Sequence, residues 1–521
     1  MSRPACVFRR NLLTLSSAAA TCVLIVLAGS AAARTSPATI APASFKPVAC
    51  SEMTAHTAGV AGAADSVPGL EDARCAYLTV PEDRRRPASD RRIRLAVAIV
   101  PAVSPKPVAD PLVFLAGGPG SSAMGQAQSL IEAGVNRDRD LILMEQRGAL
   151  FSQPQLICSE SASFVTRRVG LVYDALSTGR RQVAATRACR RRFAARGIDL
   201  GAYNTTENAA DFAELRQALG IQQWNLFGVS YGTDLALTLM REHPAGIRTV
   251  TLDSVVPPQS IGPAVFWPSA REGFDNLFAA CASQSRCRHG HPHLRRTFNG
   301  LVRKLESHPL TTRIRLEPGT AATKVVMDGG ALADWLVLMA LGPDVYVEVP
   351  SWIDQLAAGH PQNVAASWAR LSQQPGNGLQ YGVVCGEWVP YQPESEMLER
   401  SHRAFPSYPD SVLAQAPQIP FSYEECGAWN VPKAPAAQRQ VTRSNIPTLL
   451  LSGTFDAVTP PSQARVAART LSSSSVVSIL GVGHGAQLRS PCANQVLASF
   501  LSTPGAPNTS CVAGLRPPTF R

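Results

Sequence analysis

The sequence has little lysine and few aromatic residues, and its basic residues do not form the pattern of a nucleic-acid site. Only five of its 49 basic residues are lysine, and aromatic residues make up 6% of the chain. The arginines are scattered, and the tightest clusters, Arg84 to Arg86 and Arg190 to Arg192, have few aromatic neighbours. A nucleic-acid site is usually a concentrated basic patch within a recognisable binding motif. We therefore interpret the net charge of +11 as solvated surface and expect no nucleic-acid partner.

Motifs for cofactors and metals are also missing. The chain has no CxxC pair and no glycine-rich phosphate loop of the P-loop or dinucleotide type. His289, His291 and His293 lie close together, but their segment contains proline and no nearby carboxylate. We interpret them as a solvated loop, and we expect neither a metal nor an organic cofactor.

The N-terminus has the features of a secretory signal peptide. Arginines at positions 3, 9 and 10 precede an apolar stretch at about 18–28, and small residues at 31–33 provide a cleavage position. The apolar stretch is too short for a good membrane span. We expect cleavage after Ala33 and an exported protein, periplasmic or secreted, with no stable membrane span.

Removal of this segment leaves ten cysteines, and an even number in an exported chain suggests disulfides. Spacing alone does not determine connectivity. The simplest hypothesis pairs neighbours in sequence: Cys50 with Cys75, Cys158 with Cys189, Cys281 with Cys287, Cys385 with Cys426, and Cys492 with Cys511.

The order of apolar patterns predicts an α/β fold with a mostly parallel sheet and helices on both faces. Segments 76–80 and 93–100 suggest an antiparallel opening pair, and short buried strands then alternate with helices. Between about 260 and 440 this alternation gives way to helical patterns. The expected organisation is signal peptide 1–33, linker 34–70, first core part 71–260, mostly helical cap 261–440 and second core part 441–521.

Residues 224–240, WNLFGVSYGTDLALTLM, provide the first candidate for catalysis. An apolar strand ends at Val229 and a helical pattern follows Gly232, which places Ser230 on the sharp turn between them. Glycine is needed at 228 and 232 because a Cβ there would collide with the neighbouring element. The pattern is typical of a nucleophile elbow, in which the serine lies at a helix N-terminus that favours negative charge.

A nucleophilic serine needs a base and an acid, which follow it in the chain in this class of fold. His484 lies between glycines after the last apolar strand and is the candidate base. Asp456, in a turn after the penultimate strand, is the favoured acid, and Asp253 is the alternative. The amides of Tyr231 and Gly118 are the expected oxyanion donors.

These motifs together resemble the exported α/β-hydrolase-fold peptidases related to proline iminopeptidase, and more closely the tripeptidyl aminopeptidase group. The resemblance covers about Cys75 to Cys492. It rests on the 117–120 glycine loop, Gln146-Arg147-Gly148, the 203–205 segment leading into the Asp211 helix, the Ser230 turn, the Cys281 and Cys287 pair, the 452–460 segment and Gly483-His484-Gly485. The chain departs from the family pattern at Ala116, where histidine is usual, and at Glu145, where aspartate is usual.

The resemblance implies a peptide substrate with a free N-terminus, and therefore an anionic group that binds its ammonium. Glu387 is the first candidate, followed by Glu424 and Glu425. The expected activity is that of an aminopeptidase releasing short peptides or single residues. An esterase or lipase with the same triad is the alternative, and a catalytically silent binding protein on this scaffold is a remote one.

Overall fold

The computed structural model describes residues 44–55, 67–316, 319–342, 346–373 and 376–521. The expected signal peptide lies outside these residues, as does most of the expected linker.

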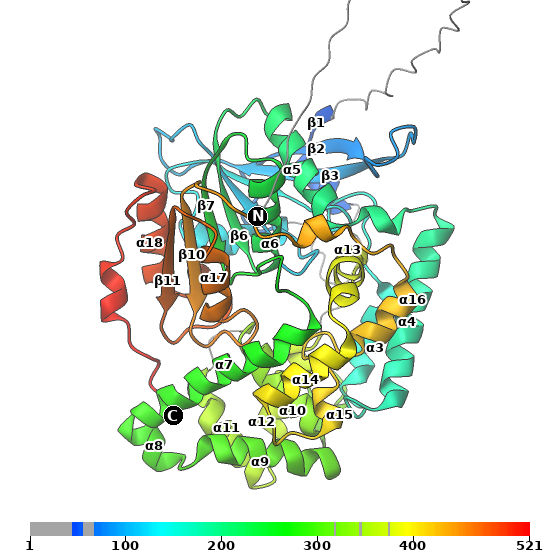
Figure 1. Ribbon diagram of the computed structural model, residues 1–521, viewed down its shortest axis with the longest axis vertical. Helices are drawn as coiled ribbons and strands as arrows, with labels where there is room; N and C mark the ends of the chain where they lie inside the picture. Colours follow the sequence, from blue (N-terminus) through cyan, green and yellow to red (C-terminus); the bar gives the residue numbers. More distant parts are fainter. Residues whose placement is uncertain (1–43, 56–66, 317–318, 343–345, 374–375) are drawn as a thin grey trace, which may run out of the picture. The chain divides into compact units, whose positions relative to one another are not determined.

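A nine-stranded sheet forms the core (Figure 1), and its central strands are buried along their whole length. Parallel strands of this kind need helices on both faces. Three antiparallel strands come first in the sheet order, β1, β2 and β3, and β3 pairs antiparallel with β5. The remaining neighbours are parallel. In sheet order the strands are β1 (Ser44–Val48), β2 (Arg74–Pro81), β3 (Arg92–Val100), β5 (Leu141–Met144), β4 (Leu112–Leu115), β6 (Trp224–Val229), β7 (Ile247–Asp253), β10 (Thr448–Gly453) and β11 (Ser474–Ile479).

Helices pack on both faces of this sheet, which confirms the predicted fold class. One face is covered by α5 (Thr205–Ala218), α6 (Tyr231–Glu242) and α17 (Pro461–Ala468). The other face is covered by α1 (Cys50–Ala55), α2 (Ala127–Glu132) and α18 (Pro491–Ser502).

The expectation of a linker over residues 34–70 is wrong for residues 44–55. Here β1 pairs antiparallel with β2, and α1 is joined to β2 by the Cys50–Cys75 disulfide. The strand has the sequence SFKPV and lies at the edge of the sheet, where proline and lysine are tolerated. Its composition therefore resembles the Pro-rich and Ser-rich stretch before it.

The chain between β7 and β10 is mostly helical, as expected, and has its own apolar core. We call residues 261–440 the inserted segment. It also contains a hairpin, β8 (Leu310–Ile314) with β9 (Thr323–Met327), which the sequence did not indicate. Its α-helices are α7 (Pro263–Ser283), α8 (Ser285–Gly290), α9 (Leu294–Ser307), α10 (Gly329–Leu338), α11 (Val349–Ala357), α12 (Gln362–Leu371), α13 (Gly378–Val383), α14 (Glu394–Ala404), α15 (Asp410–Leu413) and α16 (Ser422–Trp429).

Two more helices lie beside this segment although they come from the chain between β5 and β6. They are α3 (Ser159–Arg168) and α4 (Leu176–Ala195), and α4 packs against α16 (Figure 1). The sequence did not predict these two helices.

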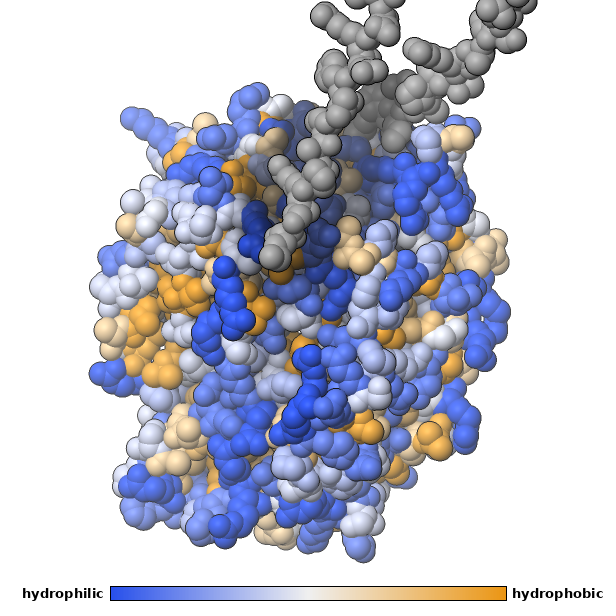
Figure 2. All heavy atoms as spheres, viewed as in Figure 1, coloured by the Kyte–Doolittle hydropathy of each residue, from blue (hydrophilic) through white to orange (hydrophobic). Residues whose placement is uncertain are grey.

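All five cysteine pairs expected from sequence proximity are present as disulfides, which confirms that hypothesis. No helix within the described residues is long and apolar enough to cross a membrane. The face shown in Figure 2 is mostly hydrophilic, with apolar patches scattered over it.

Candidate active site

Ser230 occupies the turn between β6 and α6 with a φ of 59°, a conformation that costs free energy for a residue with a side chain. A Cβ at Gly228 would lie 2.4 Å from the Gly232 carbonyl oxygen, and a Cβ at Gly232 would lie 1.9 Å from that of Leu115. The two glycines are therefore required for the close approach of β6, α6 and β4. This is the sharp turn that the sequence predicts.

The glycine loop after β4 passes directly beside Ser230. A Cβ on Gly117 would lie 2.9 Å from the Ser230 Cβ, so only glycine fits there without displacement. Gly118 follows with a φ of 108°, and it lines the same cavity as Ser230 and Tyr231. The two residues expected to supply the oxyanion donors thus line the same cavity as Ser230.

His484 and Asp456 meet beyond the ends of β11 and β10. The His484 Nδ1 atom lies 2.9 Å from Asp456 Oδ2, and the backbone N–H of His484 donates to the Ala340 carbonyl at 2.8 Å. Thr459 donates to Asp456 from both its hydroxyl and its backbone N–H. Burial alone would raise the carboxyl pKa, but the nearby His484 and these hydrogen bonds lower the pKa of Asp456 to about 2.

Asp253, the alternative acid, has a different set of partners. Its Oδ1 accepts from the backbone N–H of Ala486 at 3.0 Å, and its Oδ2 accepts from that of Gln487 at 2.7 Å. Burial raises its pKa, and these two amides partly offset that increase. Asp253 therefore anchors the turn that follows His484, whereas Asp456 contacts the imidazole itself.

Ser230, Tyr231, Gly118 and His484 all line a single cavity of about 900 Å³. Its other walls come mainly from the inserted segment and from α3 and α4, which contribute both apolar and charged side chains. The cavity is large enough to hold a small peptide-sized ligand.

Glu387 does not have the position expected of it. Both of its carboxylate oxygens accept hydrogen bonds from Thr205, Oε1 from the backbone N–H at 2.7 Å and Oε2 from the hydroxyl at 2.6 Å. Glu387 is not among the residues lining the cavity, although its neighbour Trp388 is. The expectation that Glu387 binds a substrate ammonium is therefore corrected: its carboxylate is directed toward α5.

Glu425 does line the cavity, unlike the exposed Glu424. Its Oε1 accepts from the hydroxyls of Thr186 at 2.5 Å and Tyr381 at 2.9 Å, and its Oε2 accepts from Gln182 at 2.9 Å. Burial raises its pKa, while these donors act in the opposite direction. The three donors thus stabilise the ionised form of a carboxylate that burial disfavours.

Glu145, which follows β5, forms hydrogen bonds with the residues just after the glycine loop. Its Oε1 accepts from the Ser122 hydroxyl at 2.6 Å and from the Met124 backbone N–H at 2.9 Å. Complete burial raises the pKa of Glu145 to about 7, although these hydrogen bonds lower it. The longer side chain at this position thus reaches Ser122, which lines the cavity.

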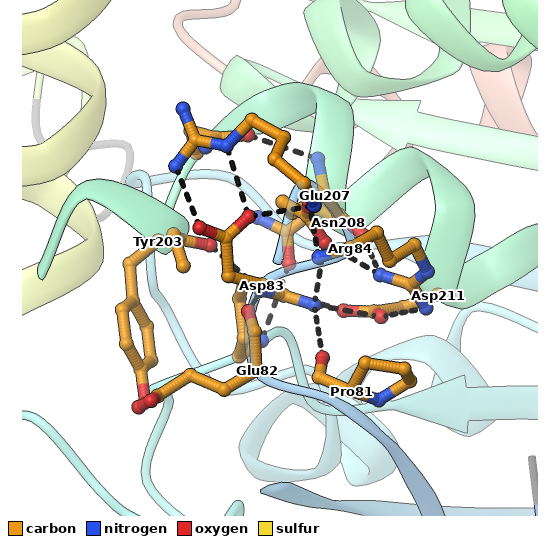
Figure 3. Close-up of polar contacts among 12 residues, drawn as sticks. Pro81, Glu82, Asp83, Arg84, Tyr203, Glu207, Asn208 and Asp211 are labelled. Carbon is orange, nitrogen blue, oxygen red and sulfur yellow. Dashed lines mark hydrogen bonds and ion pairs between the residues drawn. The ribbon is translucent and has the colours of Figure 1, made fainter. Parts of the chain in front are cut away.

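Arg147 explains the Gln-Arg-Gly motif in structural terms. It is completely buried and forms two hydrogen bonds to Asp211 of α5, at 2.9 and 2.8 Å. Arg84 forms ion pairs with the same Asp211 and with Glu207 and Glu214. Figure 3 shows this ion cluster, with Arg84, Glu207 and Asp211 labelled. The cluster fixes the loop after β5, from which Gln146 donates to the Ala116 carbonyl at 2.7 Å.

Sequence reasoning assigned no role to three residues that hold the site together. Thr459 binds Asp456, and Ser254, with a φ of 59°, accepts from the Gly485 N–H at 2.8 Å. Asn377 caps α13 and donates to the Pro119 carbonyl of the glycine loop at 3.2 Å. The available signals were the Thr-Pro pair after Asp456 and the polar residue preceding a helix.

The three clustered histidines do not converge. His291 Nδ1 lies 2.7 Å from Asp354 Oδ2, while His289 bonds to Ser285 within its own helix. Among the described residues, no group of three or more His, Cys, Asp and Glu side chains is arranged to hold a metal ion.

A sharp serine turn, an aspartate-bound histidine and a glycine loop on a mostly parallel sheet define a serine hydrolase. The chain belongs to the alpha/beta hydrolase fold family, whose model matches residues 110–491. The serine protease Hip1 of Mycobacterium tuberculosis is 25% identical over 422 residues, 76% of this chain and 78% of that protein. The tripeptidyl aminopeptidase of Streptomyces coelicolor is 30% identical over 196 residues, 36% of this chain and 35% of that protein. The solved proline iminopeptidase of Mycobacterium smegmatis has a TM-score of 0.36 and 14% identity, over 82% of this chain and 97% of that one.

Proposed function

We propose that this serine hydrolase is an exported aminopeptidase that releases short peptides or single residues from free N-termini. The observation that carries the proposal is the shared cavity: Ser230 and His484 line it together with the buried carboxylate of Glu425. The names of the relatives are consistent with this activity, since one is a serine protease and another a tripeptidyl aminopeptidase.

The proposed chemistry is acyl transfer through Ser230. His484 takes the proton of the Ser230 hydroxyl as Oγ attacks the carbonyl carbon of the scissile bond. It then donates that proton to the leaving amine as the C–N bond breaks, leaving an ester on Ser230. Water then gives a proton to His484 as its oxygen attacks the ester carbon, and His484 passes that proton to Ser230 Oγ as the C–O bond breaks and the peptide acid is released. Asp456 fixes the imidazole tautomer and stabilises the positive charge that His484 carries in between.

The negative charge that develops on the carbonyl oxygen is assigned to the amides of Tyr231 and Gly118. The Tyr231 amide is in the first turn of α6, where backbone N–H groups have no acceptor inside the helix. Its donor capacity is therefore available to the substrate, and the helix dipole adds to the stabilisation.

Glu425 is the proposed binding site for the substrate ammonium, and residues 261–440 are the proposed cap. The neutral donors around Glu425 favour its ionised form against the effect of burial, and an added ammonium would favour that form further. Because Arg168 also lines this part of the cavity and has an electrostatic interaction with Glu425, an ammonium there would have to share the carboxylate with it. Export is proposed from the N-terminal sequence and from five disulfides, which form in oxidising compartments.

The test compares Ser230→Ala with the wild type on three substrates: a free-amine peptide anilide, its N-acetylated form and a short acyl ester. We expect the wild type to prefer the free-amine peptide and the variant to lose turnover while keeping its fold. Labelling of the wild type, but not the variant, by a fluorophosphonate probe would locate the nucleophile. Turnover by Ser230→Ala would refute the mechanism, and preference for the ester would instead identify an esterase.

A further inference from the structure

The carboxylate of Glu387 is connected to Tyr231 through one intervening hydroxyl. Thr205 Oγ1 lies 2.6 Å from Glu387 Oε2 and 2.9 Å from the Tyr231 hydroxyl. Because the single Thr205 hydroxyl proton is donated to the carboxylate, the Tyr231 hydroxyl donates to Thr205. All three side chains are buried, so water does not compete for these bonds.

Tyr231 is the residue immediately after Ser230 and the first residue of α6. Tyr231 is 1% exposed as a whole residue, and the contact between its hydroxyl and Thr205 holds its ring against α5. A rigid ring limits the movement of its own backbone, which carries one of the two proposed oxyanion donors. A small displacement of such a donor has a large effect on rate.

Glu387 reaches Thr205 from a π-helical turn, Val384–Trp388, in the inserted segment. In this turn Cys385 and Trp388 line the cavity, and Cys385 forms a disulfide with Cys426, the residue after Glu425. The same turn thus lines the cavity with some residues and contacts the first residue of α5 with another. Single π-helical turns of this kind are frequent at functional sites.

The N-terminus of α5 explains why the carboxylate of Glu387 can be buried here. Thr205 begins α5, and its backbone N–H is one of the donors that have no acceptor inside the helix. Glu387 accepts from this N–H and lies at the positive end of the helix dipole. Nearby, Arg439 of the inserted segment donates to the Glu387 backbone carbonyl at 2.9 Å.

We propose that Glu387 is a positioning residue, which holds Tyr231 through Thr205 and thereby aligns the first turn of α6 for the reaction at Ser230. It does not contact the substrate. This inference rests on the proposed function, in which Ser230 is the nucleophile and the Tyr231 amide is an oxyanion donor.

The main test removes the middle hydroxyl with Thr205→Val, which preserves the side-chain shape and the backbone bond to Glu387. We expect kcat to fall about tenfold or more with little change in KM, and by the same factor for peptide and ester substrates. Thr205→Ser restores the hydroxyl and is expected to restore most of kcat. Wild-type kcat in Thr205→Val, or loss of activity in Thr205→Ser equal to that of Thr205→Val, would overturn the proposal.

Tyr231→Phe tests the same connection from its other end. Since both substitutions break one chain of hydrogen bonds, the double variant Thr205→Val/Tyr231→Phe is expected to lose no more activity than the more affected single variant. Losses that multiply would show two independent effects and contradict a common role.

Glu387→Gln separates positioning from substrate binding. A positioning residue affects free-amine and N-acetylated peptides equally, whereas an ammonium-binding residue raises KM for the free-amine peptide alone, and that result would overturn the proposal. Glu399→Gln, on the exposed side of α14, is the matched control in the same segment. Thermal unfolding of each variant confirms that the fold is retained. Turnover by Ser230→Ala tests the proposed nucleophile separately. Failure of the proposed function can therefore be distinguished from failure of the positioning role of Glu387.

Discussion

The Asp456 Oδ2 atom lies 2.9 Å from His484 Nδ1 and also accepts the hydroxyl proton of Thr459 at 2.8 Å. Its other oxygen accepts two backbone N–H groups, from Val458 and Thr459. The carboxylate is therefore held on both sides, and the imidazole can present only its Nε2 atom to the cavity.

Asp456→Asn is expected to lower kcat by about 10³–10⁴-fold with little change in KM. An amide donates where the carboxylate accepts, so it favours the imidazole tautomer that cannot take the serine proton. Steady-state rates on the preferred substrate measure the effect. Asp253→Asn provides the comparison: if it, and not Asp456→Asn, caused the loss of this size, Asp253 would be the acid.

The low pKa of Asp456 also predicts a dependence of stability on pH. Its folded-state pKa of about 2 is below the ordinary value of 3.8, so the ionised form is stabilised by folding. This contribution, about 2 kcal/mol, is present above pH 3.8 and is lost as pH falls toward 2. Between pH 4 and 2, the free energy of unfolding of the wild type should therefore fall more steeply than that of Asp456→Asn. Parallel curves in guanidinium titrations would contradict the prediction.

Glu425→Gln is expected to lower kcat/KM for free-amine peptides about ten- to hundredfold, because a charged hydrogen bond to the ammonium is worth about 1.5–3 kcal/mol. N-acetylated peptides, which lack that charge, should be cleaved at the wild-type rate. The ratio of the two specificity constants is the measurement. An equal loss on both substrates would mean that Glu425 maintains the structure of the cavity wall and does not bind the ammonium.

Glu145→Gln is expected to gain stability relative to the wild type as pH rises. Burial raises the pKa of Glu145 from 4.5 to about 7, so its contribution to stability is present below pH 4.5 and is lost as pH rises through 7. Across this pH range, the unfolding free energy of the variant should rise by about 3 kcal/mol relative to that of the wild type. Asp90→Asn, at an exposed position, is the control. A difference that stays constant with pH would show that folding leaves the pKa of Glu145 at its ordinary value.

Arg147→Met is expected to cost about 3–5 kcal/mol of unfolding free energy, because it leaves the buried carboxylate of Asp211 without its main partner. Arg85→Met removes the more exposed Arg85–Asp83 pair and should cost less than about 1 kcal/mol. Denaturant unfolding of both variants gives the comparison. Similar costs for the two would mean that the cluster at Arg147 is not a main source of stability.

The sequence predicted the sheet and the elements around Ser230 because these depend on local patterns. Buried strands and sharp glycine turns have short sequence patterns that can be recognised without the structure. Ser230, Asp456 and His484 each follow such a strand. Parallel strands bring such positions to the same edge of the sheet. Their catalytic roles stay predictions, while the proximity of Asp456 and His484 is a structural finding.

The walls of the cavity were not predictable in the same way. Gln182 and Glu425 are far apart in sequence and meet only because α4 packs against α16. Glu387 was misplaced because its partner, Thr205, is far away in sequence, and the two meet only in the folded chain. The edge strand β1 was missed because proline and lysine interrupt its apolar pattern.

The disulfide between Cys385 and Cys426 covalently joins the turn that carries Glu387 to the helix that carries Glu425. One bond thus links a residue that contacts α5 to a residue in the cavity wall. In a compartment that keeps thiols reduced, these two parts are held together only by packing and hydrogen bonds. A newly made chain therefore completes this covalent link only where it meets an oxidant.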